Sequence, residues 1–183
     1  MKPVSFPSMS AEFRAARAAD LESLVAFYDD IIDWLDATTN YPRWIRGVYP
    51  AADYLGAAIR AGELFLLEED GRILAAGGLN HDVPPGYETV DWGVEARPDE
   101  IYAIHAFGTH PTAMGRGAGS RLVAELVELA RRRGMRAIRL DVIAGNEPAR
   151  AFYRRAGFAE RSNSRLYYKD TGWESFTLLE YVL

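Results

Sequence analysis

Residues 101–158 read IYAIHAFGTHPTAMGRGAGSRLVAELVELARRRGMRAIRLDVIAGNEPARAFYRRAGF, a segment in which strand and helix patterns alternate. The run 101–110 predicts a strand that leads into a glycine loop, and a helix is expected over 117–133. The buried side of that helix is predicted to consist of Leu122, Val123, Leu126, Val127 and Ala130. The run 137–144 predicts a second strand, and a helix at 147–156 should end at Gly157. Such a strand–helix–strand unit requires two parallel strands joined by a right-handed crossover.

The segments on either side of this unit add antiparallel strands and two more helices. The predicted elements are a strand at 11–16, a helix at 20–36 with Asp20 as N-cap, a helix at 51–61, a strand around 88–95 and two strands near 158–168 and 174–182. Asp70-Gly71 lies between ELFLLEE and RILAAGGLN, which is a strong hairpin signal. The hairpin requires antiparallel pairing, so the sequence predicts an α/β fold with a mixed sheet.

Length and composition set the class of protein. The 183 residues fit one domain, which we place at 11–183, and we expect 1–10 to be a flexible N-terminal segment. The chain has no cysteine, which excludes disulfides and thiolate metal sites. The start MKPVSFPSMS lacks the apolar centre of a signal peptide, and no apolar run is long enough for a membrane span. These features favour a cytoplasmic protein that does not contact membranes.

The net charge of −5 is unevenly distributed. Residues 114–161 contain 11 arginines and 5 acidic residues, a balance of +6, whereas the remaining chain has 10 basic and 21 acidic residues, a balance of −11. A basic segment within an acidic chain indicates that this segment meets an anion. The arginine run 131–133 has a simpler explanation, because cations are favourable at a helix C-terminus.

The glycine loop 114–120 is a candidate phosphate site. Gly115, Gly117 and Gly119 let the backbone approach a ligand closely, and the following helix offers unpaired N–H groups. Together these features suit a pyrophosphate, to which Arg116 can add a side-chain contact. The alternative is a tight structural turn. The loop matches neither the P-loop, which requires Gly-Lys before Ser or Thr, nor the dinucleotide-binding spacing.

The helix that starts at Asn146-Glu147-Pro148 presents a second candidate surface. Asn146 is a favourable N-cap and lies about two turns before Tyr153, so both share one helix face with Ala149 between them. A small residue between two polar ones leaves a groove for a slender ligand. A plain N-cap followed by a half-buried tyrosine explains the same pattern.

The run Asn146–Phe158 resembles the second signature of the GCN5-related N-acetyltransferases (GNAT family), and the loop 114–119 is similar to that family's Gln/Arg-x-x-Gly-x-Gly/Ala motif. Order and spacing agree over residues 101–158. The resemblance implies a central mixed sheet of about seven strands flanked by about four helices. Met114 replaces the usual Gln or Arg, which removes one side-chain donor but leaves the backbone that the phosphates contact.

The same resemblance implies an acetyl-CoA-dependent N-acetyltransferase in which the pantetheine arm lies in a split between the two crossover strands. By that resemblance Tyr153 is the general acid that protonates the departing thiolate. The residues implied to bind acetyl-CoA are Phe107, Gly108, Thr109, Met114, Gly115, Arg116, Gly117, Ala118, Gly119, Ser120, Asn146, Ala149, Arg150 and Tyr153.

The attacking amine must lose a proton, because a primary amine with a pKa near ~10 is mostly protonated at neutral pH. His105 is the first candidate base, since it titrates in the useful range and lies two residues before Phe107, hence on the same strand face. Asp91 and Glu95, or water, are the alternatives. His110 is interpreted as structural.

The family's acceptor pocket is formed by the first helices and the late hairpin, which here are rich in aromatic residues. These are Trp34, Tyr41, Trp44, Tyr49, Tyr167, Tyr168 and Trp173. Aromatic walls and acidic charge suit a cationic or aromatic amine, although aromatics at helical spacing also form cores. We place Trp34, Trp44, His81, Asp91 and Glu95 in the acceptor site; a solvated loop pair is the alternative for His81-Asp82.

The leading hypothesis is transfer of an acetyl group from acetyl-CoA to a primary amine of a small molecule, by direct attack in a ternary complex. The alternatives are a protein or peptide amine as acceptor and a non-catalytic acyl-CoA-binding domain. A nucleic-acid partner is disfavoured by the acidic remainder of the chain. No metal site is expected, because three scattered histidines lack ligand spacing, and a homodimer is expected from the family alone.

Overall fold

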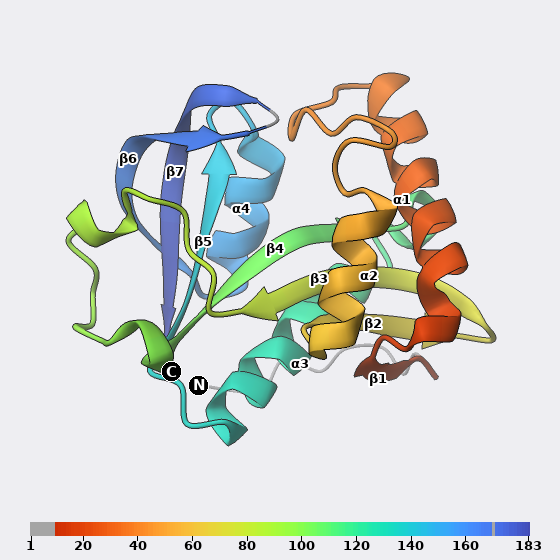
Figure 1. Cartoon of the computed structure of the whole chain (residues 1–183), viewed down its shortest axis with the longest axis horizontal. Helices are drawn as coiled ribbons and strands as arrows, with labels where there is room; N and C mark the ends of the chain where they lie inside the picture. Colours follow the sequence, from red (N-terminus) through yellow and green to blue (C-terminus); the bar gives the residue numbers. More distant parts are fainter. Residues whose placement is uncertain (1–9, 170) are drawn as a thin grey trace.

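The computed structural model describes residues 10–169 and 171–183. Residues 1–9, where the flexible segment is expected, lie outside that description. The strands are β1 (Glu12–Ala15), β2 (Leu64–Glu69), β3 (Arg72–Asn80), β4 (Ile101–Thr109), β5 (Ala137–Ile143), β6 (Ala159–Tyr168) and β7 (Gly172–Val182). The α-helices are α1 (Leu21–Asp36), α2 (Ala52–Ala61), α3 (Ala118–Arg132) and α4 (Glu147–Arg155). These elements agree with the mixed sheet and the four helices predicted from sequence (Figure 1).

The seven strands of the described residues form one sheet in the order β1-β2-β3-β4-β5-β7-β6. Only β4 and β5 are parallel; the other neighbours are antiparallel. The β2–β3 turn is made by Asp70 and Gly71, which both have positive φ, of 50° and 74°. That combination belongs to the type I′ turn, which matches strand twist, and it confirms the hairpin predicted from Asp-Gly.

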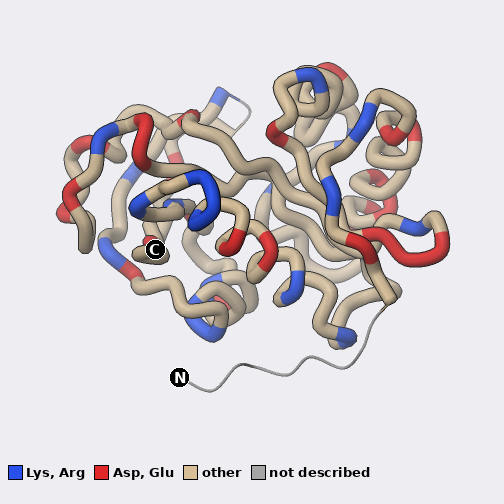
Figure 2. The backbone as a smooth tube through the Cα atoms, turned by 90° about the horizontal axis from the view of Figure 1, so that it is seen from below, with Lys and Arg blue, Asp and Glu red and all other residues tan. Residues whose placement is uncertain are grey.

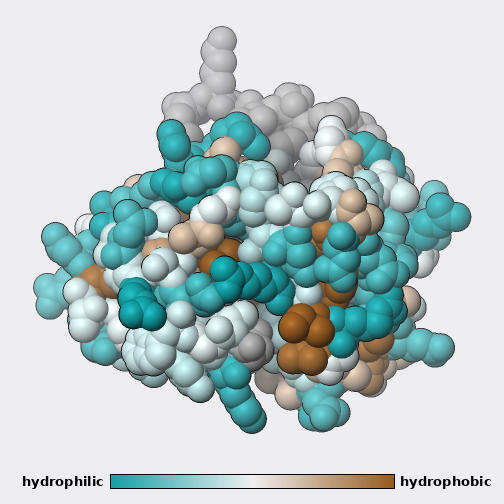
Figure 3. Space-filling model, turned by 90° about the horizontal axis from the view of Figure 1, so that it is seen from above, coloured by the Kyte–Doolittle hydropathy of each residue, from teal (hydrophilic) through white to brown (hydrophobic). Residues whose placement is uncertain are grey.

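Helices cover both faces of the sheet with apolar side chains. On one face α3 buries the five residues that periodicity predicted, Leu122, Val123, Leu126, Val127 and Ala130, against β2 to β5. On the other face α1 and α2 pack around Leu24, Tyr28, Ile31 and Leu55. On the side of the molecule seen in Figure 3 hydrophilic residues predominate, and the hydrophobic patches are small and separate.

The parallel pair β4–β5 separates soon after it begins. Ile101 to Ala103 pair with Ala137 to Arg139, and beyond Ala103 the two strands diverge, as the V between them in Figure 1 shows. Strand β5 instead pairs with β7 over its whole length, and β4 pairs with β3 up to Thr109. The sheet therefore opens between two well-paired halves, which leaves one edge of β4 without a strand partner.

The strand predicted around 88–95 is wrong. Within residues 81–100 the structure has two short 3₁₀ turns, η2 (Tyr87–Thr89) and η3 (Pro98–Glu100). Side chains of the sheet take the backbone bonds of this segment: the N–H of Gly93 donates to Glu180 at 2.6 Å, and Arg139 donates to the carbonyl of Val94 at 3.0 Å. At Gly93 and Val94 these side-chain bonds take the place of pairing with a neighbouring strand.

Asp20 precedes α1 as predicted, but its side chain makes no capping bond to that helix. Its carboxylate instead accepts from the Arg14 guanidinium at 2.7 Å and from the Arg17 N–H at 2.6 Å. The residue thus ties β1 to the turn before the helix, because the arginine offers a stronger, charge-assisted bond.

The basic segment 114–161 forms ion pairs rather than one exposed cationic surface. At least six of its arginines contact carboxylates: Arg116, Arg131, Arg136, Arg139, Arg150 and Arg161. Figure 2 accordingly shows basic and acidic positions interspersed along the backbone. No helix among the described residues is long and apolar enough to cross a membrane.

Candidate active site

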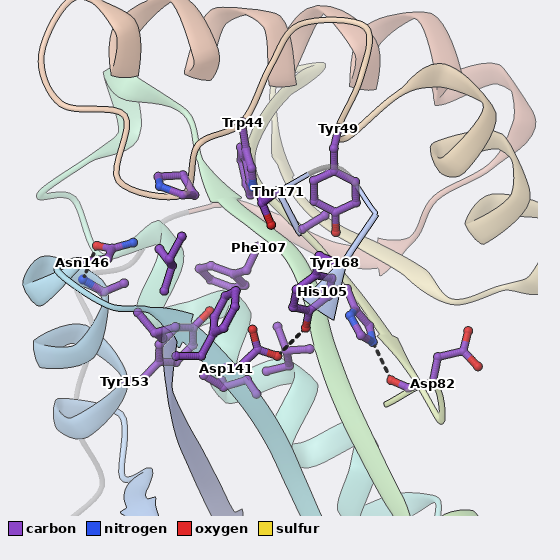
Figure 4. Close-up of a pocket in the computed structure, with 18 of the residues that line it drawn as sticks. Trp44, Tyr49, Asp82, His105, Phe107, Asp141, Asn146, Tyr153, Tyr168 and Thr171 are labelled. Atoms are coloured by element: carbon purple, nitrogen blue, oxygen red, sulfur yellow. Dashed lines mark hydrogen bonds between the residues drawn. The ribbon is translucent and has the colours of Figure 1, made fainter. Parts of the chain in front are cut away.

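A cavity of about 370 Å³ lies where β4 and β5 separate (Figure 4). Its walls come from β4, β5, α4, the loop before α2 and the β6–β7 hairpin. The residues that line it include Trp44, Tyr49, Tyr54, Asp82, His105, Phe107, Asp141, Asn146, Ala149, Tyr153, Tyr168 and Thr171. The opening in the sheet thus brings residues from its two faces into one space.

A bulge in β4 decides which face each side chain joins. Ala106 has a positive φ of 46°, rare for a residue with a side chain, and the β3–β4 register shifts opposite it. Phe107 consequently packs with the α3 core and Ala106 with the α1–α2 core, while His105 lies near Tyr54 of α2. The prediction that His105 and Phe107 share a face is wrong, because the bulge breaks the alternation.

The α4 side of the cavity contains the predicted tyrosine. Tyr153 is 7% exposed, and its ring packs edge-on against Phe107 and Phe158. Burial, together with the charge of Asp141, holds the pKa of its phenol well above the ordinary value. Tyr153 is therefore a protonated donor at neutral pH, placed beside the open edge of β4.

Asn146 begins α4 and faces the same cavity. Its side-chain oxygen accepts from the N–H of Ala149 at 3.1 Å, which is the N-cap bond predicted from sequence. Within residues 10–169 and 171–183 the amide nitrogen of the same side chain has no hydrogen-bond acceptor, so it can donate to a ligand. Ala149 also lines the cavity, and its small side chain leaves room for a ligand along this part of the helix.

The glycine loop leads from β4 into α3 with the geometry of an anion site. Gly115 and Gly117 have positive φ of 73° and 88°, and Gly117 is the N-cap, with no side-chain capping bond. The first N–H groups of α3 are therefore available to a ligand, and the helix dipole favours an anion there. A side chain at Gly119 would approach Thr109 Oγ1 to 2.7 Å, so α3 packs closely against β4 here. The loop thus has the geometry of a site for an anionic group such as a pyrophosphate.

Two predicted arginines have protein partners. Arg116 donates to Glu69 at 3.3 Å, and Arg150 contacts Glu147 and Glu160 at 2.6 Å and 2.9 Å. Both side chains lie outside the cavity lining, at the surface near the loop and helix that carry them.

The opposite side of the cavity is aromatic and polar. Trp44, Tyr49 and Tyr54 form a chain of rings with centroids 6.3 Å and 5.2 Å apart, and the pKa values of both tyrosines are raised by burial. Thr171 adds a buried hydroxyl that has no hydrogen-bond partner among the described residues. These groups suit a ligand with an apolar body and a few polar atoms.

His105 lies at the margin of this aromatic side. Its Nε2 is 2.9 Å from the carbonyl oxygen of Asp82. A carbonyl only accepts hydrogen bonds, so Nε2 carries the proton and Nδ1 is the nitrogen that can accept one. Figure 4 shows the imidazole turned toward Asp82.

Asp141 is the main residue of the cavity that the sequence analysis did not identify. Its Oδ2 accepts hydrogen bonds from Tyr87 and Tyr168, both at 2.7 Å. Burial raises the pKa of this carboxyl, while the two phenol bonds and the nearby His105 lower it, and the first effect prevails. One signal was available: Asp141 interrupts the otherwise apolar second half of AIRLDVI, on the face that alternates with Ile138, Leu140 and Val142.

Several residues predicted for the acceptor site lie elsewhere. Trp34 is 40% exposed on α1, and His81 bonds the carbonyl of Ile101 and packs on Tyr102. Asp91 and Glu95 line a separate hollow beside Arg139. The remaining predicted aromatics divide in the same way: Tyr49 and Tyr168 line the cavity, whereas Tyr41, Tyr167 and Trp173 are exposed.

Comparisons with known proteins identify the fold and the family. Residues 19–158 match the model of the acetyltransferase (GNAT) family. The N-alpha-acetyltransferase RimI of Mycobacterium tuberculosis is 37% identical over 81 residues, 44% of this chain and 49% of RimI. The mycothiol acetyltransferase of Cellulomonas flavigena is 37% identical over 102 residues, 56% of this chain and 28% of that protein.

Among solved structures, yncA from Salmonella typhimurium with its cofactor acetyl-CoA superposes with a TM-score of 0.67 at 18% identity, covering 96% of this chain and 95% of that chain. The two matches above span half or less of the curated relatives. The family match nevertheless covers most of the described chain. It includes the glycine loop 114–120 and helix α4 with Asn146 and Tyr153. The chain belongs to the acetyltransferase (GNAT) family.

Proposed function

We propose that this protein is an N-acetyltransferase that moves an acetyl group from acetyl-CoA to a primary amine of a small molecule, by direct attack in a ternary complex. The observation that supports this most is the cavity in the sheet, which joins a face suited to acetyl-CoA with a face suited to an amine. Two substrates that approach from opposite faces can meet there without a covalent enzyme intermediate.

The α3–α4 face is the proposed acetyl-CoA side. The unpaired edge of β4 beyond Ala103 offers N–H and C=O groups to the amides of the pantetheine arm, as an added strand would. The N-terminus of α3 holds the pyrophosphate, and the Asn146 amide nitrogen donates to the arm. The likeness in fold to yncA, which was solved with acetyl-CoA, supports this placement.

Tyr153 is the proposed general acid. Its phenol stays protonated because burial raises its pKa, and it lies on α4 next to the cavity. In that position it protonates the sulfur of CoA as the carbon–sulfur bond breaks, which makes the thiolate a better leaving group.

The aromatic face is the proposed amine side. It is closed over by two segments of the chain, which favours a small acceptor. The loop that carries Trp44 and the β6–β7 hairpin approach each other across the cavity, and an ion pair between Arg43 and Glu174 joins them. An extended peptide needs an open groove at this point. The relatives include both an N-alpha-acetyltransferase and a mycothiol acetyltransferase, so a peptide amine is the second candidate.

The test measures binding and transfer separately. Calorimetry with acetyl-CoA should show one site per chain, and a free-thiol assay should then detect CoA release with phenethylamine or putrescine but not with a hexapeptide that has a free N-terminus. Tyr153→Phe should keep acetyl-CoA affinity and lower kcat by roughly 100-fold or more, since the ring contacts remain and the acid is lost. Release with the peptide alone contradicts the small-molecule assignment, and absence of acetyl-CoA binding contradicts the whole proposal.

A further inference from the structure

A hollow of about 550 Å³ is lined by the loop 81–100, β4 and β5. Figure 1 shows this loop beside the β5–β7–β6 half of the sheet, where its residue Tyr87 packs with Leu166 of β6 and Leu178 of β7. Tyr87 is 3% exposed, so the loop has a firm apolar anchor on the sheet. Among the described residues, the hollow and the active-site cavity have no lining residue in common, so the hollow is a separate space.

The lining of the hollow is largely apolar and contains two aromatic rings. Its apolar members include Val90, Val94 and Ile101. The rings belong to Tyr87 and Trp92, and their centroids are 5.2 Å apart. The indole N–H of Trp92 donates to the carbonyl of Tyr87 at 2.8 Å, which holds the two rings together. A space of this size and composition accommodates a small organic molecule with an apolar body.

Three exposed carboxylates give the hollow a negative rim. They belong to Glu88, Asp91 and Glu95. Glu88 accepts from the N–H of Gly86 at 2.8 Å. The carboxylates of Asp91 and Glu95 have neither an ion-pair nor a hydrogen-bond partner in the part of the chain that the structure describes. Their uncompensated charge favours a cation at the opening of the hollow.

Arg139 is the only basic residue of the described lining, and its charge is compensated by the fold. Its side chain is 7% exposed, and its Nε donates to Glu180 at 3.1 Å while its Nη2 donates to the carbonyl of Val94 at 3.0 Å. Its guanidinium carbon lies 4.3 Å from the centre of the Trp92 ring. Nη1 has no acceptor among the described residues, which leaves one donor of this buried group for a polar atom of a ligand. Arg139 thus fixes Trp92 without making the hollow cationic.

We propose that this hollow is a second binding site, for an organic ammonium ion with an apolar body, and that its occupancy affects the active-site cavity. The rings of Tyr87 and Trp92 attract the cation, and the carboxylates of Asp91 and Glu95 neutralise it. The apolar part of the ligand packs on the valines of the lining. The inference goes beyond the proposed acetyl transfer, because binding in the hollow requires neither acetyl-CoA nor a reaction.

Tyr87 connects the hollow with the active-site cavity. Its ring lines the hollow, and its hydroxyl donates at 2.7 Å to Asp141, which lines the cavity. A ligand that presses on the rings of Tyr87 and Trp92 therefore displaces a side chain that holds part of the cavity wall. We expect the bound cation to lower kcat/KM of acetyl transfer at least ~5-fold, the lower end of typical coupling between two sites.

Calorimetry with benzyltrimethylammonium tests the site directly, because this cation has no N–H group and cannot be acetylated. The wild type should bind it with a Kd below ~1 mM. Asp91→Asn/Glu95→Gln keeps the shape of both side chains and should weaken binding at least ~10-fold, and added salt should weaken binding to the wild type. Asp99→Asn is the matched control, because it removes an exposed carboxylate of the same loop that lies outside the described lining, and it should bind like the wild type.

Two further variants separate the hollow from the active-site cavity. Trp44→Leu removes an aromatic ring from the cavity and should leave the affinity for benzyltrimethylammonium unchanged. Tyr87→Phe keeps the ring in the hollow and removes the hydrogen bond to Asp141. It should bind the cation normally, but the cation should no longer change kcat/KM in the thiol-release assay with the better of phenethylamine and putrescine.

Three results contradict the inference. Binding that is lost in Trp44→Leu and kept in Asp91→Asn/Glu95→Gln assigns the cation to the active-site cavity and overturns the second site. The absence of saturable binding to the wild type up to ~10 mM does the same. An effect on kcat/KM that persists in Tyr87→Phe overturns the connection through Tyr87. The thiol assay without the cation tests acetyl transfer, and calorimetry tests the hollow without any transfer, so the failure of one is distinguishable from the failure of the other.

Discussion

Replacing Glu180 by glutamine tests a buried charge cluster that joins the sheet to the loop 81–100. The Glu180 side chain is 0% exposed and accepts from Arg139 Nε at 3.1 Å, from Arg161 Nε at 3.1 Å and from the N–H of Gly93 at 2.6 Å. Arg139 is 7% exposed, and its guanidinium stacks on Trp92 at 4.3 Å. One carboxylate therefore neutralises two arginines and holds the loop 81–100 on the sheet.

The magnitude follows from what remains after Glu180→Gln. The amide keeps the shape, but it has one accepting oxygen, and its NH₂ group opposes the guanidinium donors. Removing one partner of a buried pair leaves an uncompensated charge and costs about 3–5 kcal/mol. In a chain of this size each kcal/mol lowers Tm by about 2–4 °C. We therefore expect Tm to fall by about 6–20 °C.

Scanning calorimetry measures this directly, with urea unfolding as the equilibrium check. The matched control is Glu174→Gln, because Glu174 pairs with Arg43, whose side chain is 55% exposed, and such pairs contribute at most about 1 kcal/mol. A Glu180→Gln protein that melts within about 2 °C of Glu174→Gln refutes the reasoning. That result means that water solvates the two arginines once the carboxylate is lost, so that no uncompensated buried charge remains.

Three further predictions follow from single contacts. Gly119→Ala should weaken acetyl-CoA binding about tenfold by calorimetry, because its Cβ displaces Thr109 and with it the start of α3, whereas Ala124→Ser, at an exposed position of the same helix, should bind normally. Leu126→Ala should lower the free energy of unfolding in urea by about 2–5 kcal/mol, since Leu126 is fully buried; Arg132→Ala should cost under ~0.5 kcal/mol. The hydrogen bonds of Arg14 lower the pKa of Asp20, so ionised Asp20 stabilises the fold above its unfolded pKa of ~3.9 and this contribution is lost as pH falls below it. Asp20→Asn should reduce the difference between urea midpoints at pH 7 and pH 3, and an unchanged difference excludes this ion pair as its source.

The elements that the sequence predicted correctly have local causes. The buried stripe of α3 follows from the spacing of Leu122 to Ala130, and the β2–β3 turn follows from Asp70-Gly71, which tolerates positive φ. The N-cap bond of Asn146 is likewise a contact between near neighbours. Each of these features depends on residues within a few positions of one another, so a single sequence contains the necessary information.

The errors have long-range causes. The segment 88–95 has strand-like residues, yet Glu180 and Arg139, on strands distant in sequence, take its backbone bonds instead. The bulge at Ala106 depends on the register against β3, and it places His105 and Phe107 on opposite faces of β4. Strict alternation along β4 could not reveal it, because nothing about alanine favours a positive φ.

By itself, the sequence determined the strands and helices other than the mistaken strand at 88–95, the mixed sheet, the glycine loop with its helix and the family to which they belong, because each depends on local pattern. Only the tertiary structure decided how far β4 and β5 separate, which side chains share the cavity and that Asp141 lies between Tyr87 and Tyr168. Those three residues are 27 or more positions apart, and burial and electrostatics act on them only after the chain has brought them together.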